Sequence, residues 1–173
     1  MTNFKKLYRE STTAPSSAPF NGKTVWAADK FQVSNKEKLI IQVEKTNSKY
    51  KQGFCLGVEG SVKFMGQQYR KGKKVNFFLW EREESYEVQV FTKTPYIYIK
   101  NAWYDPTLGD HAPACYITGT EWLKYDYWGG AGMIIEEIEN GRRYYCNDGE
   151  CDDDFDDIIF TVKRKIELDD LKK

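Results

Sequence analysis

The chain has 173 residues, of which 40% are hydrophobic, 16% aromatic and 30% charged, and its formal net charge is zero. A chain of this length suits one domain and can bury a core without needing a disulfide or a metal, and its aromatic content argues against disorder. No apolar run approaches the roughly 20 residues of a membrane span, so the sequence predicts no membrane span.

The N-terminal part of the chain, residues 1–22, is expected to be a flexible arm, because Ser11–Phe20 is rich in Ser, Thr and Pro. From Thr24 onward, short runs of β-branched and aromatic residues alternate with turn signals. These runs predict eleven strands, at Thr24–Ala27, Lys38–Glu44, Gly53–Val58, Val62–Met65, Val75–Trp80, Tyr86–Phe91, Tyr96–Lys100, Ala114–Thr118, Met133–Ile138, Arg142–Cys146 and Ile158–Lys163.

Several of these runs show the period of two that is typical of a half-buried antiparallel strand, with Tyr86–Phe91 as the example. Val75–Trp80 and Ile158–Val162 are more continuously apolar, which favours central strands. Asn140-Gly141 is a two-residue hairpin signal, because both residue types tolerate a positive φ.

Helical character is confined to Ile166–Lys172. The sequence therefore predicts an all-β fold, an antiparallel β-sandwich or partly closed barrel with a short C-terminal helical tail. We expect a single sandwich domain over residues 23–165 and a tail over residues 166–173, and we see no internal repeat or linker.

The basic residues are concentrated in the first part of the chain, where residues 1–75 contain 15 Lys and Arg but only 5 Asp and Glu. Such a surface could contact nucleic acid, but the lysines are scattered among predicted strands, which favours a solvated surface. We therefore do not expect a nucleic-acid partner. The first ten residues lack the apolar core of a secretory signal, so we expect a cytoplasmic protein. Export by a non-standard route, or a leader missing from this chain, stays open.

The four cysteines, Cys55, Cys115, Cys146 and Cys151, permit disulfides in three pairings, and the lack of a leader favours free thiols instead. A zinc site is not expected, because there is no C-x-x-C pair and His111 is the single histidine. No residue pattern supplies a nucleophile with an orienting base and third group. We therefore expect a protein that is not an enzyme.

The most informative segment is the stretch Asp148–Asp157, which we call the acidic loop. Seven of its ten residues are carboxylates and it lies between two apolar runs, so it is pinned at both ends. Two like charges about 4 Å apart repel by roughly 1 kcal/mol in water and roughly 4 kcal/mol at an effective dielectric near 20. The loop therefore needs a neutraliser: raised pKa values, nearby Lys or Arg, or a hard divalent cation.

Calcium suits this composition best, because it takes six to eight oxygen ligands in loose geometry. Asp152, Asp154 and Asp157 have a D-x-D-x-x-D spacing that can converge on one ion, with Phe155 pointing inward and Gly149 allowing a sharp turn. The alternative is a solvated loop that pairs with Arg142 and Arg143. The loop is no EF-hand, since its flanks are strands and the sixth-position Gly and twelfth-position Glu are missing.

The stretch from Asp152 to Asp157, followed by the apolar Ile158-Ile159-Phe160, resembles the calcium loop of bacterial calcium-dependent fucose- and mannose-binding lectins. In that family an Asp-x-Asp-aromatic-Asn-Asp pattern leads into an apolar strand. The likeness covers about ten residues, and here an Asp replaces the Asn. Other β-sandwiches, such as C2 domains, also hold calcium in acidic loops. The resemblance implies calcium ligands at Asp148, Asp152, Asp154, Asp156 and Asp157.

Aromatic residues with nearby carboxylates form a second candidate site, since rings can stack on a sugar while carboxylates accept its hydroxyls. The residues are Trp103, Tyr104, Asp105, Tyr127 and Trp128. Core packing is the alternative role for these rings.

Two functions follow as hypotheses. The first is a calcium-binding β-sandwich that recognises another molecule, with carbohydrate as the favoured ligand. The second is a cytoplasmic protein-binding domain, of the immunity or inhibitor type, whose acidic loop docks on a basic protein partner.

Overall fold

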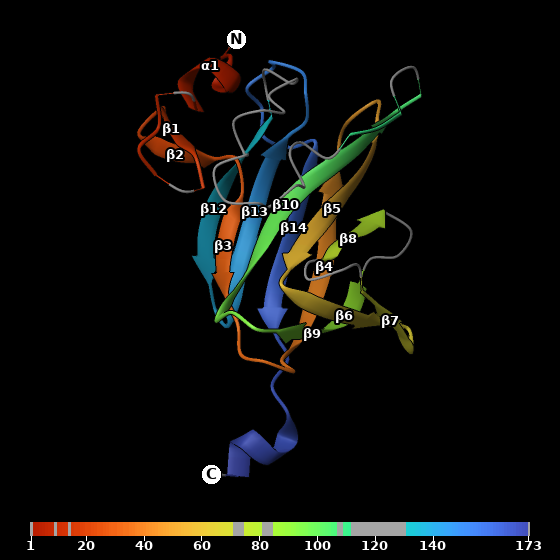
Figure 1. The fold of residues 1–173 in the computed structure, drawn as a ribbon. Helices are drawn as coiled ribbons and strands as arrows, with labels where there is room; N and C mark the ends of the chain where they lie inside the picture. The colour runs from red at the N-terminus through yellow and green to blue at the C-terminus, as the bar shows by residue number, and fades with distance from the viewer. Residues whose placement is uncertain are drawn as a thin grey trace.

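The computed structural model describes residues 2–8, 10–13, 15–70, 75–80, 85–106, 109–111 and 131–172. In this part of the chain, two antiparallel sheets pack against each other without closing into a barrel (Figure 1). A short 3-10 helix, Leu168–Lys172, follows the last strand. The predicted all-β class, the sandwich and the helical C-terminal turn are therefore confirmed. The strand predicted at residues 114–118 lies outside the described residues.

Within the described residues, the larger sheet has nine strands in the order β1-β2-β12-β13-β14-β4-β9-β6-β7. They are β1 (Ser17–Phe20), β2 (Lys23–Trp26), β4 (Lys38–Thr46), β6 (Gly60–Phe64), β7 (Gln67–Tyr69), β9 (Ser85–Thr92), β12 (Gly132–Ile138), β13 (Gly141–Asn147) and β14 (Ile158–Arg164). The smaller sheet has the order β11-β10-β5-β8, and β3 also pairs with β10. Its strands are β3 (Asp29–Gln32), β5 (Lys51–Val58), β8 (Val75–Trp80), β10 (Tyr96–Asp105) and β11 (Gly109–His111).

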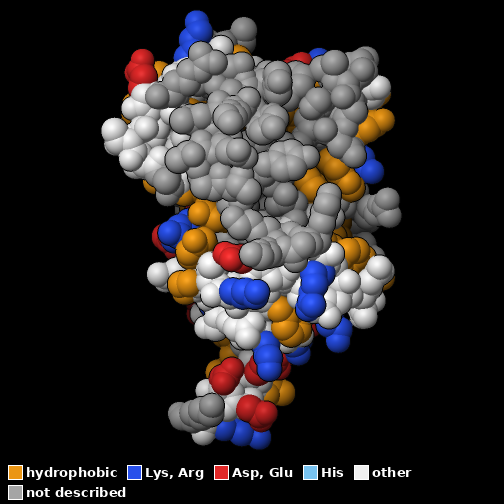
Figure 2. All heavy atoms as spheres, viewed as in Figure 1, with side chains coloured by type: hydrophobic (Ala, Val, Ile, Leu, Met, Phe, Trp, Pro, Cys, Tyr) orange, Lys and Arg blue, Asp and Glu red, His pale blue; other side chains and the backbone are white. Residues whose placement is uncertain are grey.

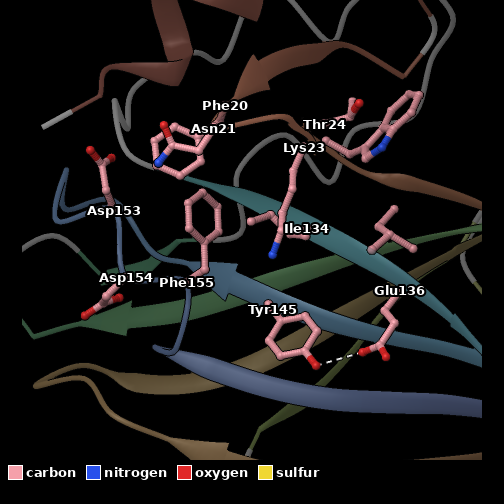
Figure 3. Close-up of a pocket in the computed structure, with 12 residues that line it drawn as sticks. Phe20, Asn21, Lys23, Thr24, Ile134, Glu136, Tyr145, Asp153, Asp154 and Phe155 are labelled. Atoms are coloured by element: carbon pink, nitrogen blue, oxygen red, sulfur yellow. Dashed lines mark hydrogen bonds between the residues drawn. The ribbon is translucent and has the colours of Figure 1, made fainter.

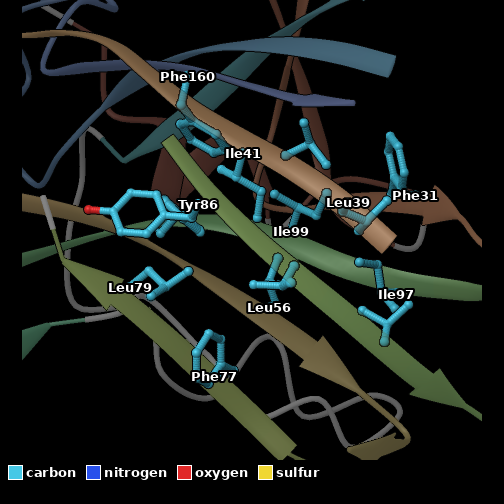
Figure 4. Close-up of a cluster of buried hydrophobic side chains, with 14 of the residues drawn as sticks. Phe31, Leu39, Ile41, Leu56, Phe77, Leu79, Tyr86, Ile97, Ile99 and Phe160 are labelled. Atoms are coloured by element: carbon cyan, nitrogen blue, oxygen red, sulfur yellow. The ribbon is translucent and has the colours of Figure 1, made fainter. Parts of the chain in front are cut away.

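The core lies between the sheets and is built from side chains of alternate residues (Figure 4). Along β9, Tyr86, Val88 and Val90 are buried while Ser85 and Glu87 are exposed, which confirms the predicted alternation. Phe54 of β5 stacks on Phe160 of β14, with 5.2 Å between ring centroids, so aromatic contacts join the two sheets.

Of the two strands predicted to be central, one is central and the other has a neighbour on one side only among the strands that the structure describes. β14 lies between β13 and β4 in the larger sheet, whereas β8 ends the path of the smaller sheet. The apolar content of β8 serves the core through Val75, Phe77 and Leu79, which are buried, while Phe78 is 37% exposed. An edge strand can be as apolar as a central one when its outward side chains are also aromatic.

The hairpin predicted at Asn140-Gly141 is confirmed, but its turn lies one residue earlier. β12 pairs with β13 from Ile138↔Gly141 onward, so Glu139 and Asn140 form the turn. Asn140 adopts the left-handed conformation (φ 61°). Gly141 is instead required by close approach, because a Cβ there would lie 1.9 Å from the Val162 carbonyl oxygen of β14.

Replacing Gly141 with Ala is expected to lower the free energy of unfolding by about 3 kcal/mol, because β13 and β14 must separate to admit the methyl group. Gly66→Ala is the matched control, since nothing lies within 4 Å of a Cβ at Gly66 and only its positive φ opposes the change. Urea unfolding measures both. Equal losses in the two variants would contradict the close-approach explanation.

The N-terminal segment is packed where the sequence predicted a flexible arm. The helix α1 (Phe4–Tyr8) and strand β1 lie within residues 1–22, and β1 pairs with β2. Phe4 is fully buried in a second apolar cluster, separate from the core between the sheets. The Ser- and Pro-rich composition gave no sign of this packing, because the apolar residues that anchor the segment are few and irregularly spaced.

The helices in the described part of the chain are too short and too polar to cross a membrane. On the face seen in Figure 2, basic side chains are separated by side chains of other kinds. On this face no continuous basic area stands out among the residues that the structure describes.

Candidate metal centre

The acidic loop joins two neighbouring antiparallel strands of the larger sheet. β13 ends at Asn147 and β14 begins at Ile158, and Cys146 pairs with Ile158 across the ladder. Both ends of the loop are therefore held by strand pairing, as predicted. Its carboxylates cannot relax their repulsion by extending into solvent as those of a free tail would.

Hydrogen bonds close the base of the loop. The Asp148 N–H donates to Oδ2 of Asp157 at 2.7 Å, and the Asp157 N–H donates to the Cys146 carbonyl at 3.1 Å. The Phe155 N–H donates to Oδ1 of Asn147 at 2.6 Å. Asn147 is fully buried, and its carbonyl accepts a bond from the Asn101 side chain of β10. The loop base is thus fixed to both sheets.

The tight bends of the loop occur at residues other than the expected one. Asp153 and Phe155 have positive φ values of 62° and 54°, and Gly149 is not among the described residues with a positive φ. Such conformations are uncommon for side chains larger than Asn or Asp. Surrounding contacts therefore hold Phe155 in place.

Phe155 anchors the loop, as predicted, but in the second apolar cluster. It is 5% exposed, and its ring lies 5.6 Å from that of Phe4 and 5.3 Å from that of Phe20, measured between centroids. The backbone N–H and hydroxyl of Thr2 also donate to the Asp153 carboxylate, each at 3.0 Å. The N-terminal segment and the acidic loop therefore support each other at one end of the sandwich.

Asp152, Asp154 and Asp157, which we call the carboxylate triad, each offer an oxygen within 4.8 Å of the others. Three oxygens at that spacing leave a central point roughly 2.8 Å or less from each, close to the 2.3–2.6 Å of calcium–oxygen contacts. Asp152 and Asp154 are exposed and Asp157 is buried. The geometry therefore gives a cation one buried ligand, two ligands at the surface and an open side for water.

The triad carboxylates share raised pKa values. Burial, together with the charges of Asp148, Asp152 and Asp154, raises the pKa of Asp157 to about 7 against the opposing hydrogen bond from the Asp148 N–H. Burial and neighbouring carboxylates also raise the pKa values of Asp152 and Asp154. A bound divalent cation would oppose these shifts, because its positive charge favours the ionised carboxylates.

These shifts predict that the cation-free protein loses stability as the pH rises. The folded pKa of Asp157 is about 7, against an ordinary value of 3.8, so between about pH 4 and pH 7 the folded state binds more protons than the unfolded state. The free energy of unfolding should therefore fall through this window. Urea titrations at pH 5 and pH 8 with a chelator, on wild type and Asp157→Asn, measure this. If the free energy of unfolding falls equally between pH 5 and pH 8 in the wild type and the variant, the prediction is contradicted.

The other exposed carboxylates of the loop have partners of their own. Asp156 accepts a bond from Lys45 at 2.6 Å and a second from Asn47, and the Lys45 hydrogen bond lowers its pKa. Glu150 forms an ion pair with Lys49. Asp156 was predicted to be a metal ligand, but it pairs with β4 and is not part of the triad.

The arginines that the alternative hypothesis assigned to the loop bind elsewhere. Arg142 donates to Asp29 at 2.7 Å and pairs with Glu137, while Arg143 pairs with Glu44 and Glu136. Arg143 therefore pairs within the larger sheet, whereas Arg142 links that sheet to β3 of the smaller sheet. Among the described residues, no lysine or arginine pairs with a triad carboxylate.

Asp148, the fifth predicted ligand, is buried beside the triad and bonds to Asp157 through its backbone N–H. It is 1% exposed, and its carboxylate accepts bonds from the Ser48 hydroxyl at 2.6 Å, the Gln52 amide at 3.3 Å and the Glu150 N–H at 3.0 Å. Gln52 is fully buried, and its Oε1 atom has no hydrogen-bond partner. A buried, unpaired carbonyl oxygen is costly, and it is of the oxygen type that calcium accepts.

The second predicted site is only partly described. Trp103 of β10 is 1% exposed, so its ring offers no face to a sugar, whereas Tyr104 beside it is 37% exposed. The side chain of Asp105 and the residues Tyr127 and Trp128 lie outside the described residues. A sugar site formed by these residues stays a prediction.

Four residues outside the loop bond to its carboxylates, and the sequence did not predict these contacts. They are Ser48, Gln52, Lys45 and Thr2. They come from β4, β5, the connection between these strands and the N-terminus, and only strand pairing brings them near. Cys146 and Cys151 are free thiols in the part of the chain that the structure describes. No family model, no curated protein and no solved structure matches this chain.

Proposed function

We propose that this chain is a calcium-binding β-sandwich recognition module in which the carboxylate triad holds one ion. The observation that carries the proposal is the triad itself: three carboxylate oxygens within 4.8 Å, one belonging to a buried Asp157. Like charges at that spacing are unfavourable unless protons or a cation offset them. Calcium supplies two positive charges and accepts an irregular set of oxygens.

The arrangement around the triad supports this proposal. Asp156 and Glu150 already pair with lysines, and Asp153 is hydrogen-bonded to Thr2. The charge left unpaired is thus concentrated on the three residues that converge. Calcium would also hold the loop, and through Phe155 the N-terminal segment, in one conformation. A surface ordered in this way is suited to bind a partner.

The alternative, in which the loop docks on a basic protein, is less well supported. Electrostatic docking needs exposed charges that no other group neutralises. Here Lys45 and Lys49 offset two carboxylates, and Asp148 and Asp157 are buried. A docking partner would thus meet chiefly Asp152 and Asp154.

A thermal-shift series with chelator-treated protein tests the proposal. We expect millimolar calcium to raise the melting temperature by several degrees, in line with the stabilisation by a ligand that binds the folded state, and magnesium to raise it less. Asp156→Asn is the matched control, because it removes one carboxylate of the loop outside the triad and should keep the calcium response. A response lost equally in Asp156→Asn and Asp154→Asn would contradict the assignment.

A further inference from the structure

A groove of about 850 Å³ lies beside the triad, between the β1–β2 hairpin and the outer surface of β12 and β13 (Figure 3). This volume falls in the range of small-molecule sites, roughly 300–1,000 Å³. The acidic loop forms one end of the groove through Asp153, Asp154 and Phe155. The groove therefore shares Asp154 with the proposed calcium site.

The lining of the groove combines ring faces with polar groups. Trp26, Phe20 and Tyr145 are partly exposed there, and Ile134 adds apolar surface. Lys23 and Glu136 are exposed, and Figure 3 shows the amine of Lys23 among the lining side chains. A ligand that fits this surface has an apolar face for the rings and several neutral donors and acceptors for the rim.

The charges of the groove disfavour a strongly charged ligand. Among the described residues of the lining, Lys23 is the one basic side chain against three carboxylates, so an anionic ligand is opposed. Two of those carboxylates are engaged, since Glu136 accepts from Tyr145 at 2.7 Å and from Arg143, and Asp153 accepts from Thr2. The third, Asp154, belongs to the triad. A cationic peptide would therefore meet Lys23 and few free carboxylates.

We propose that this groove binds a neutral oligosaccharide, with Trp26 and Tyr145 packing against sugar rings and Lys23 and Asn21 bonding to hydroxyls. The inference rests on the proposed function in one respect, because calcium at the triad holds the loop that closes one end of the groove. It places the carbohydrate site on β2, β12 and β13, on the larger sheet, instead of on the surface around Trp103.

The test is a glycan array of neutral, sulfated and sialylated mono- to tetrasaccharides, probed with the calcium-loaded chain. The best-retained neutral trisaccharide is then titrated by calorimetry. We expect Trp26→Ala to lower affinity at least about tenfold, as loss of a central aromatic contact does, and Trp26→Phe to restore part of it. Lys23→Met replaces an exposed side chain and should keep the fold. It should also lower affinity, because it removes the amine that bonds to sugar hydroxyls. Trp80→Ala, which removes a partly exposed Trp from the smaller sheet, should leave affinity unchanged.

The outcomes separate this inference from the proposed function. Calcium binding without retention of any neutral glycan would overturn the inference and leave the calcium site standing. Glycan binding that persists in chelator and depends on Trp26 would support the groove and contradict calcium's role in it. Retention of sulfated glycans alone, binding of a Lys/Arg-rich peptide in place of sugar, or insensitivity to both Trp26→Ala and Lys23→Met would overturn the groove assignment.

Discussion

Asp157→Asn is expected to change stability in opposite directions with and without calcium. At pH 8 in chelator, the variant should gain on the order of 2 kcal/mol in the free energy of unfolding, because it removes a buried carboxylate whose pKa is about 7. The amide oxygen of Asn can still accept the hydrogen bond from the Asp148 N–H. In calcium the variant should lose the stabilisation that the wild type gains, since one ligand is gone.

Urea unfolding at pH 8 measures both halves of this prediction. Asp156→Asn is the control, because it removes a carboxylate that pairs at the surface with Lys45, and such pairs contribute about 0–1 kcal/mol. That variant should be no more stable than wild type in chelator and should keep its response to calcium. A metal-free Asp157→Asn less stable than wild type would show that the ionised carboxylate stabilises the loop by itself.

Phe155→Ala is expected to detach the loop and the N-terminal segment from each other. The change removes a ring that is 5% exposed and contacts Phe4 and Phe20, so the free energy of unfolding should fall by about 3 kcal/mol. Hydrogen exchange in α1 should rise more than in β14, because α1 depends on this cluster. Calcium affinity should fall about tenfold, since ordering the loop then opposes binding.

Phe77→Ala is the matched control for this prediction. Phe77 is also 5% exposed, but it belongs to the core between the sheets. Its loss should destabilise the protein to a similar extent without changing calcium affinity. If the two variants reduce calcium affinity equally, global destabilisation accounts for the effect and Phe155 has no special place in ordering the loop.

The sequence predicted most of the strands because burial on one face produces a pattern of period two. β9 is the example, and the continuously apolar run Val75–Trp80 was located to the residue. The sequence did not predict β1, β3, β7 and β11. These strands have three or four residues each, which is too few to show an alternation of apolar and polar residues. The sequence also missed α1, whose five residues are held by Phe4 and Tyr8 in a contact that no local signal encodes.

The candidate site was predictable in composition but not in geometry. Carboxylate density identified the acidic loop, and the spacing of Asp152, Asp154 and Asp157 identified the triad. Asp156 pairs with Lys45 instead of joining the triad. This pairing depends on the position of β4 beside β14, where the register shifts near the loop. Pairings of this kind join residues more than 100 positions apart, and a single sequence contains no local record of them.

Calorimetric titration of calcium into chelator-treated protein tests the central claim most directly, with Asp154→Asn/Asp157→Asn as the comparison. The triad predicts one saturable site per chain in the wild type and none in the double variant, while Asp156→Asn binds as the wild type does. Absence of heat in the wild type, together with an unchanged melting temperature at millimolar calcium, would contradict the account. Raised pKa values would then limit the charge of the triad, while Lys45 and Lys49 offset Asp156 and Glu150.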